Sequence, residues 1–123
     1  MDQLTRVVID AIEDKKGTDI RVYDMKTLSP FMDTMIVCST QNLRQNNAVV
    51  QSIKDKLKEE GLECDMRAEG RQDSKWILVD LKDVVVNVFV QDERDFYGLD
   101  KLYRDVFIDR TEEADSTGEE PGA

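Results

Sequence analysis

Two apolar runs separated by only two residues constrain the fold of this chain more than any other feature. Residues 76–81 read WILVDL and residues 84–90 read VVVNVFV, with Lys82 and Asp83 between them. Two intervening residues leave room only for a tight reversal, so the spacing predicts a β-hairpin. Because both runs are apolar at nearly every position, we expect both faces of the hairpin to be covered, at least one of them by helices.

Five further segments with a clear period precede this hairpin. Two carry apolar residues at helical spacing, with Asp2 and Asn42 placed as N-caps and Gln45 at capping-box distance from Asn42. Three others alternate apolar and polar residues or form a short continuous apolar run, which is typical of strands. The predicted elements are helices over residues 2–15 and 42–60 and strands over residues 19–25, 34–39 and 62–68.

A helix is also expected after the hairpin. Apolar side chains there repeat at helical spacing and would dock the helix on the sheet. Tyr97 falls about 100° from Phe96 on a helical projection and is therefore predicted to lie off this stripe. The stripe consists of Phe96, Leu99, Leu102, Tyr103, Val106 and Phe107.

These elements predict one α/β domain over residues 1–108, with helices flanking a mixed sheet of about five strands. A chain of 123 residues is long enough for one such core without disulfides or metals. Its two cysteines, Cys38 and Cys64, are expected to be buried reduced thiols. Residues 109–123 carry a net charge of −5 and are expected to form a disordered acidic tail. No apolar run approaches the roughly 20 residues of a membrane span, and no secretion signal is visible, which predicts a cytoplasmic protein.

The composition restricts the chemistry. The absence of histidine removes every mechanism that needs an imidazole base, and glycine-rich phosphate loops are missing. We therefore expect no enzyme, no catalytic residue, no metal and no cofactor. The alternative, a metal-dependent nucleotidyltransferase, would have to use Asp33, Asp80 or Asp83, which are poorly placed to form a pair of metal ligands on one strand.

The charge of the chain indicates the kind of partner it favours. With 27 acidic and 17 basic residues the net charge is −10. Such a protein repels phosphate backbones, so little direct nucleic-acid contact is expected and a basic protein partner is favoured. The same acidity can equally serve solubility alone.

Two aromatic residues are candidates for a recognition surface. Trp76 begins a strand beside a polar loop, and Tyr97 lies off the packing stripe; both residue types are enriched at interface hot spots. Trp76 could equally be an ordinary residue at the edge of the core. Asp80 has two readings of similar weight, an interface role or a turn residue that bonds backbone amides. Arg94 could equally form a surface ion pair with a neighbouring aspartate.

Several stretches, in this order and spacing, resemble the ribosomal silencing factor family RsfS, also called Iojap, over about residues 2–105. They are Gly17-Thr18-Asp19-Ile20, Asp33 in MDTMIVCST, Asn42-Leu43-Arg44-Gln45, Glu69-Gly70, WILVDL from Trp76, residues 83–89, Arg94-Asp95-Phe96-Tyr97 and Leu99-Asp100-Lys101-Leu102. The chain departs from the family pattern at Lys82, Asn87, Asp100 and Tyr103.

The resemblance implies a sheet similar to that of nucleotidyltransferases, without established enzymatic activity. It also implies binding to large-subunit ribosomal protein number fourteen, at the face that meets the small subunit. Such binding would block subunit joining and lower translation when nutrients are short. A plain homodimer that pairs its hairpin aromatics remains an alternative. The partner-binding residues that the resemblance implies are Trp76, Leu81 and Tyr97, with Asp80, Leu99 and Asp100 as neighbouring candidates.

Overall fold

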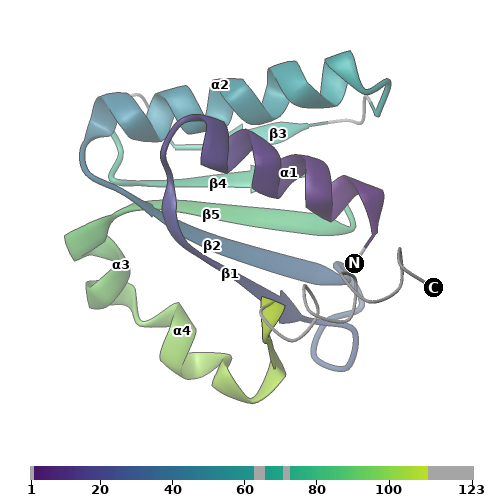
Figure 1. The fold of residues 1–123 in the computed structure, drawn as a ribbon. Coiled ribbons are helices and arrows are strands. Elements are labelled where there is room, and N and C mark those ends of the chain that lie inside the picture. Colours follow the sequence, from purple (N-terminus) through teal and green to yellow (C-terminus); the bar gives the residue numbers. More distant parts are fainter. Residues whose placement is uncertain (1, 63–65, 71–72, 111–123) are drawn as a thin grey trace.

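The structure is a computed structural model that describes residues 2–62, 66–70 and 73–110 (Figure 1). Up to residue 97 the elements follow one another in the predicted order, namely a helix, two strands, a helix, three strands and a helix. The elements are α1 (Gln3–Asp14), β1 (Thr18–Asp24), β2 (Thr34–Thr40), α2 (Leu43–Glu59), β3 (Arg67–Glu69), β4 (Trp76–Asp80), β5 (Val84–Val90), α3 (Gln91–Tyr97), α4 (Leu99–Leu102), the 3-10 helix η1 (Arg104–Val106) and β6 (Phe107–Ile108).

The strands form one mixed sheet in the order β3-β4-β5-β2-β1-β6. Only β2 and β5 run parallel, and every other neighbouring pair is antiparallel. The predicted α/β class and mixed sheet are therefore confirmed. The sheet has six strands where about five were expected, because the chain adds the two-residue strand β6 to the outer edge of β1.

The hairpin that dominates the sequence is present as β4 and β5. Their register runs from Trp76 opposite Phe89 to Asp80 opposite Val85. Lys82 has a φ of 78°, and this left-handed conformation closes the reversal. Every residue of β5 is buried, as its continuous apolar sequence predicted.

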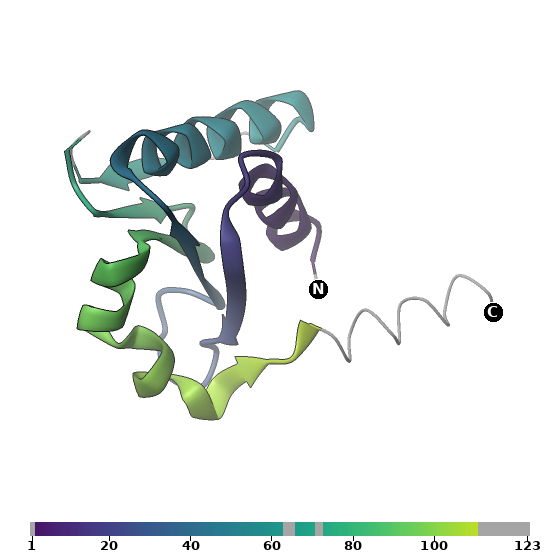
Figure 2. The same cartoon turned by 60° about the vertical axis from the view of Figure 1, so that its left-hand side comes forward.

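The sheet is covered on both faces (Figure 2). On one face α1 and α2 pack against the larger apolar cluster, which includes Ile12, Ile53 and Val86. On the other face α3, α4 and η1 lie beside a smaller cluster built around Tyr23 and Phe89. Side chains that alternate along a strand therefore belong to different clusters.

Both predicted N-caps are confirmed. The Asp2 carboxylate accepts a hydrogen bond from the Thr5 amide, and the Asn42 side chain accepts one from the Gln45 amide, each at 2.8 Å. The Gln45 side chain reaches back to the Gln41 amide rather than to that of Asn42. These bonds satisfy amides that would otherwise lack partners at the helix starts.

Part of the predicted third strand lies outside the described residues. A strand was expected over residues 62–68, whereas β3 begins only at Arg67, and residues 63–65, including Cys64, are not described. Cys38 is buried as predicted, and burial raises the pKa of its thiol to about 12. The tail predicted over residues 109–123 is described only to Arg110, whose guanidinium donates to the Ile20 carbonyl at 3.1 Å, so its disorder stays a prediction.

The prediction of one continuous terminal helix is wrong. Gly98 adopts a left-handed φ of 64° and separates α3 from α4, after which the chain continues through η1 into β6. Leu99, Tyr103 and Val106 pack against the smaller cluster, as the apolar stripe predicted. The remaining members of the stripe, Phe96, Leu102 and Phe107, are exposed. Phe107 lies on β6 and its ring still contacts that of Tyr23, with 5.7 Å between centroids. Among the helices of the described residues, none is long and apolar enough to cross a membrane.

Candidate partner-binding surface

Four aromatic rings stack where β4, β5 and α3 meet. Trp76 lies against Phe89 with 4.9 Å between ring centroids and against Tyr97 with 4.5 Å. Phe96 packs edge-on against Tyr97 at 5.4 Å. The stack begins in the core at Phe89, which is buried, and ends at the surface at Phe96. It therefore supports exposed rings on a rigid base.

A buried amide fixes the Trp76 indole. Its Nε1 donates to the Asn87 Oδ1 at 2.9 Å, and Asn87 lies on β5 within the core. Trp76 itself is half-buried at the edge of the smaller cluster, as the interpretation as a core-edge residue predicted, and its role in recognition stays a prediction.

Exposed apolar side chains continue from this stack along α3 and α4. Phe96 is 80 % exposed, Tyr97 47 % and Leu102 69 %. A shallow groove runs beside them, lined by Tyr97, Gly98 and Lys101, among others. We call Trp76, Phe96, Tyr97 and Leu102 the α3–α4 surface.

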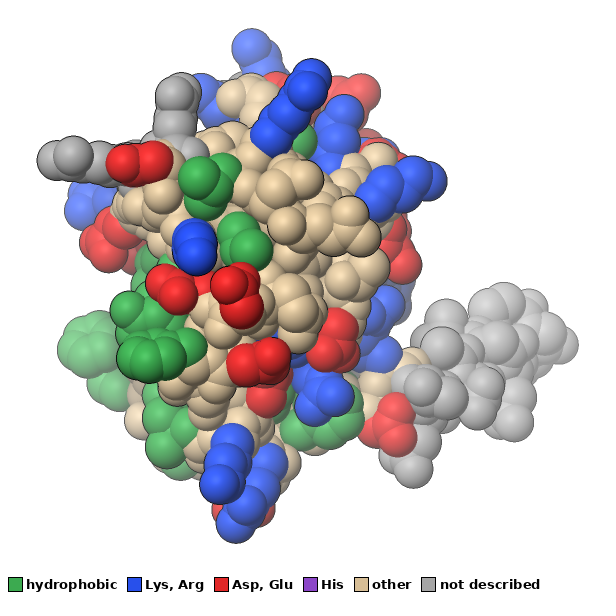
Figure 3. Space-filling view, turned by 90° about the vertical axis from the view of Figure 1, so that its left-hand side faces the viewer, with side chains coloured by type: hydrophobic (Ala, Val, Ile, Leu, Met, Phe, Trp, Pro, Cys, Tyr) green, Lys and Arg blue, Asp and Glu red, His purple; other side chains and the backbone are tan. Residues whose placement is uncertain are grey.

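Figure 3 shows hydrophobic side chains gathered on the side of the molecule that carries α3. Large exposed apolar groups that adjoin one another are unusual on a protein without a partner. The sequence singled out Trp76 and Tyr97 but missed Phe96 and Leu102. Both residues were assigned to the apolar stripe that packs on the sheet, and were therefore not considered as surface residues. Gly98 was the sequence signal that the helix would end before Leu99.

Acidic side chains border this surface. Asp92, Glu93 and Asp95 lie on α3 itself. Lys75 approaches Asp92 at 3.8 Å, a weak pair between exposed groups. Figure 3 shows acidic side chains beside the hydrophobic ones. The border is acidic along α3, whereas Lys101 and Arg104 line the groove beside α4. The α3 side therefore suits a partner that offers apolar groups among basic ones.

Leu81 cannot belong to such a surface in this structure. It is 2 % exposed and packs in the larger cluster, on the face covered by α1 and α2. The prediction that it faces a partner is therefore wrong for the folded chain. Leu99 is half-buried and packs against the smaller cluster, so it anchors α4 rather than standing free. The Asp80 carboxylate accepts from the Lys82 amide at 2.8 Å, which supports its reading as a turn residue.

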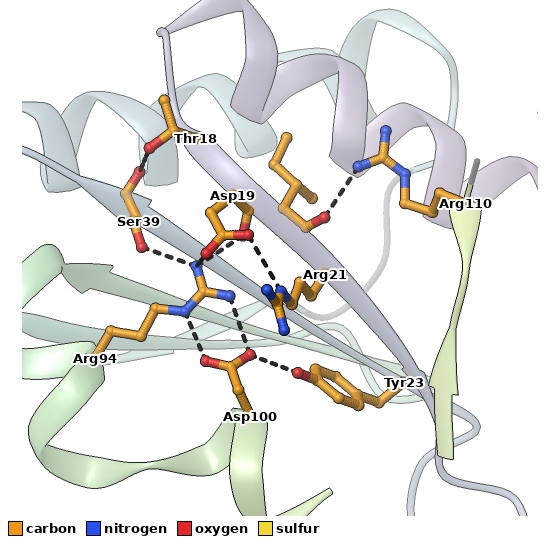
Figure 4. Close-up of polar contacts among 9 residues, drawn as sticks. Thr18, Asp19, Arg21, Tyr23, Ser39, Arg94, Asp100 and Arg110 are labelled. Carbon is orange, nitrogen blue, oxygen red and sulfur yellow. Dashed lines mark hydrogen bonds and ion pairs between the residues drawn. The ribbon is translucent and has the colours of Figure 1, made fainter. Parts of the chain in front are cut away.

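The remaining candidate, Asp100, is engaged in a polar network with Arg94 (Figure 4). Arg94 is not a surface ion pair: it is 3 % exposed, and its Nε and Nη2 donate to the two Asp100 carboxylate oxygens at 2.8 and 3.0 Å. Its Nη1 donates to the Asp19 carbonyl at 2.7 Å and to the Ser39 hydroxyl at 2.8 Å. Tyr23 donates its hydroxyl to Asp100 at 2.5 Å.

This network sets the charge state of its members. Burial of the Asp100 carboxyl opposes its ionisation, but the hydrogen bonds from Arg94 and Tyr23 outweigh that effect and hold the pKa of Asp100 below its ordinary value. Burial of the Tyr23 phenol, together with its bond to Asp100, raises the pKa of Tyr23 above its ordinary value. The network therefore contains an ionised carboxylate and a neutral phenol at neutral pH.

Tyr23→Phe is expected to lower the free energy of unfolding by about 1–2 kcal/mol at pH 8, because it removes a hydrogen bond to a charged group. The folded-state pKa of Tyr23 lies above the unfolded value, so its contribution is present below about pH 10 and is lost as the pH rises through the folded pKa. The difference between wild type and variant should therefore shrink at pH 11. Urea midpoints at both pH values measure it, and a difference that stays constant would contradict the assignment.

The enzyme alternative would need acidic side chains that together hold a metal ion. Among the residues that the structure describes, no three or more His, Cys, Asp or Glu side chains are placed to hold one metal ion. Asp33 and Asp83 lie at neighbouring turns, joined through the Asp33 amide and the Asp83 carbonyl at 2.8 Å.

The fold and this surface together define a small α/β domain with exposed aromatic side chains where β4 and α3 meet. Residues 1–122 match the sequence profile of the family described as "Ribosomal silencing factor during starvation". Ribosomal silencing factors RsfS of Halalkalibacterium halodurans and Bacillus subtilis are 36 % and 37 % identical to the chain, which covers 87 % and 86 % of their lengths; the alignments span 84 % and 83 % of the chain. The chloroplastic protein Iojap of Zea mays is 31 % identical over 76 % of the chain and 40 % of its own length.

Solved structures agree with these sequence matches. A crystal structure of a Chromobacterium violaceum protein superposes with a TM-score of 0.77 at 36 % identity, covering 84 % of this chain and 87 % of that one. A Bacillus halodurans protein superposes with a TM-score of 0.74 at 34 % identity, covering 87 % and 97 %. The chain belongs to the ribosomal silencing factor family. Members of this family are ribosome-associated regulators of translation, and the family is not a known enzyme family.

Proposed function

We propose that this protein silences translation by docking its α3–α4 surface on the large ribosomal subunit and preventing the small subunit from joining, in the cytoplasm and when nutrients are short. The observation that carries the proposal is the exposed aromatic pair Phe96 and Tyr97, supported from below by Trp76. Aromatic side chains on a rigid base lose little conformational freedom on binding, which makes them effective anchors.

The charge of the protein favours a protein contact on the ribosome over an RNA contact. At a net charge of −10 the chain is repelled by ribosomal RNA, and the acids of α3 stand beside the aromatic anchors. A basic ribosomal protein at the subunit interface offers the complementary charge. The family resemblance points to large-subunit protein number fourteen as this partner.

Size makes a steric mechanism sufficient. A folded domain of about 100 residues has a radius of gyration of ~13 Å. One copy bound on the face of the large subunit would hold the small subunit well beyond contact distance at that place. No chemical step is needed for this effect.

A joining experiment tests the proposal. Purified large subunits are incubated with the protein, small subunits are added, and sedimentation separates joined from free subunits. Excess protein is expected to shift the subunits to the free fractions, whereas Tyr97→Ala should not at the same concentration. Phe31→Ala removes a ring that is even more exposed, 82 % against 47 % for Tyr97, from the loop between β1 and β2, and serves as the control. Joining that proceeds unchanged with saturating wild-type protein would sink the proposal.

The same exposed surface also supports pairing of two copies of the free chain. Apolar groups that a ribosome would cover are available to a second copy in its absence. Light scattering should then report a dimer that Tyr97→Ala weakens, and the dimer would have to separate before docking.

A further inference from the structure

The segment that carries the α3–α4 surface is held by little apolar burial. α3 has seven residues and α4 has four, and helices this short are not stable by themselves in water. Across α3, α4 and η1, the single fully buried side chain is that of Arg94. By contrast, α1 buries six side chains. Leu99, Tyr103 and Val106 add partly buried apolar contacts, and the docking of α3 and α4 depends on a charged group beside them.

Arg94 ties three parts of the chain together. One edge of its guanidinium forms a fork with Asp100 on α4, and Nη1 bonds to the Asp19 carbonyl on β1 and to the Ser39 hydroxyl on β2. Figure 4 shows the guanidinium between the terminal helices and the sheet. Without Asp100 the buried guanidinium would keep only the half-exposed Asp19 carboxylate, 3.7 Å from its Nη1, so loss of the fork carries a free-energy penalty.

The pair also spans the break between the helices. Arg94 stands before Gly98 and Asp100 after it, and the left-handed Gly98 lets the carboxylate turn back toward the guanidinium. Two parallel hydrogen bonds fix both the distance and the plane of the two groups. The pair thereby sets where Tyr97 lies relative to Trp76, although neither Arg94 nor Asp100 is an exposed contact residue.

We propose that the Arg94–Asp100 pair is a positioning device that docks α3 and α4 on the sheet as one unit, and that this unit detaches from an intact α/β core when the pair is broken. The consequence for ribosome binding rests on the proposed function above. Elements with few buried apolar contacts commonly open before the core does.

Trp76 provides the reporter for the test, because it is the single tryptophan of the chain and Tyr97 covers it at 4.5 Å. Asp100→Asn is expected to shift the Trp76 emission to the red before any denaturant is added, while the far-UV circular dichroism still shows one cooperative unfolding transition of the core. Hydrogen exchange of the Leu102 and Tyr103 amides, which bond within α4, should accelerate at least about tenfold more than that of the β5 amides. Binding to large subunits should weaken by about tenfold or more.

Asp10→Asn, the same charge change on α1, is the matched control and should leave the Trp76 emission, the amide exchange and the binding to large subunits at their wild-type values. Arg94→Lys keeps the charge but cannot form the fork with Asp100. Its emission shift and its amide exchange rates should therefore lie between those of wild type and those of Arg94→Met. Unshifted emission in Asp100→Asn and Arg94→Met, or emission and circular dichroism lost together in one transition, would overturn the proposal. Fluorescence and exchange need no ribosome, so they still decide the question if wild-type protein fails to bind subunits, a result that would remove the proposed function alone.

Discussion

Tyr97→Ala is expected to weaken binding to the large ribosomal subunit by about 30-fold, the factor that corresponds to ~2 kcal/mol for a central aromatic anchor. Tyr97 is 47 % exposed and lies over the half-buried Trp76, so it joins the exposed surface to the core. Its removal takes away contact area and also the support of the neighbouring ring. Co-sedimentation with large subunits at several protein concentrations measures the loss.

The expected loss of binding must come from the surface and not from unfolding. Tyr97 packs on Trp76 and Phe89 at the end of α3, so Tyr97→Ala should lower the free energy of unfolding by about 0.5–1.5 kcal/mol, which leaves the protein folded at the conditions of the binding experiment. Phe31→Ala, an equal truncation on the loop between β1 and β2, should change neither binding nor stability. If Tyr97→Ala bound as tightly as wild type, the α3–α4 surface would not be the docking site.

The sequence predicted those parts of the fold that local chemistry decides. A two-residue gap between apolar runs allows only a reversal, and Asp2 and Asn42 cap their helices through bonds that span three residues. Such signals need no knowledge of the rest of the chain. The burial of β5 was likewise predictable from local sequence, because a continuous apolar run indicates a strand in the interior of the sheet.

The C-terminal segment shows where local patterns fail. The helical period from residue 96 onward is real, but a glycine in the middle of a helix costs about 1 kcal/mol and readily adopts the left-handed conformation that Gly98 takes. The Arg94–Asp100 pair spans the break at Gly98. The Arg94 guanidinium also bonds to groups on β1 and β2 that lie far away in sequence. Tertiary contacts of that kind leave no periodic trace.

Two of the three candidate residues of the hairpin, Trp76 and Leu81, lie on opposite faces of the sheet for a reason that the sequence does contain. Side chains alternate between the faces of a strand, and Trp76 and Leu81 are an odd number of positions apart. Trp76 therefore packs in the smaller cluster beside α3, and Leu81 in the larger cluster beneath α1 and α2. Applying this alternation along residues 76–81 would have excluded a common surface for both.

Leu81→Ala is expected to lower the free energy of unfolding by about 2–5 kcal/mol, the cost of a cavity in a packed core. Leu81 is 2 % exposed and packs in the larger cluster, so its methyl groups have no route to a ribosomal partner in the folded chain. Any loss of ribosome binding in this variant should follow its loss of folded protein. Urea titration followed by circular dichroism measures the change.

Leu102→Ala makes the matched comparison, because it deletes the same atoms from a leucine that is 69 % exposed on α4. It should change the free energy of unfolding by no more than about 0.5 kcal/mol, yet weaken binding to the large subunit. Leu81→Met, which nearly conserves volume, should recover most of the stability. A Leu81→Ala protein with the wild-type urea midpoint but without ribosome binding would show the opposite, namely that Leu81 reaches the partner and that the hairpin end rearranges on docking.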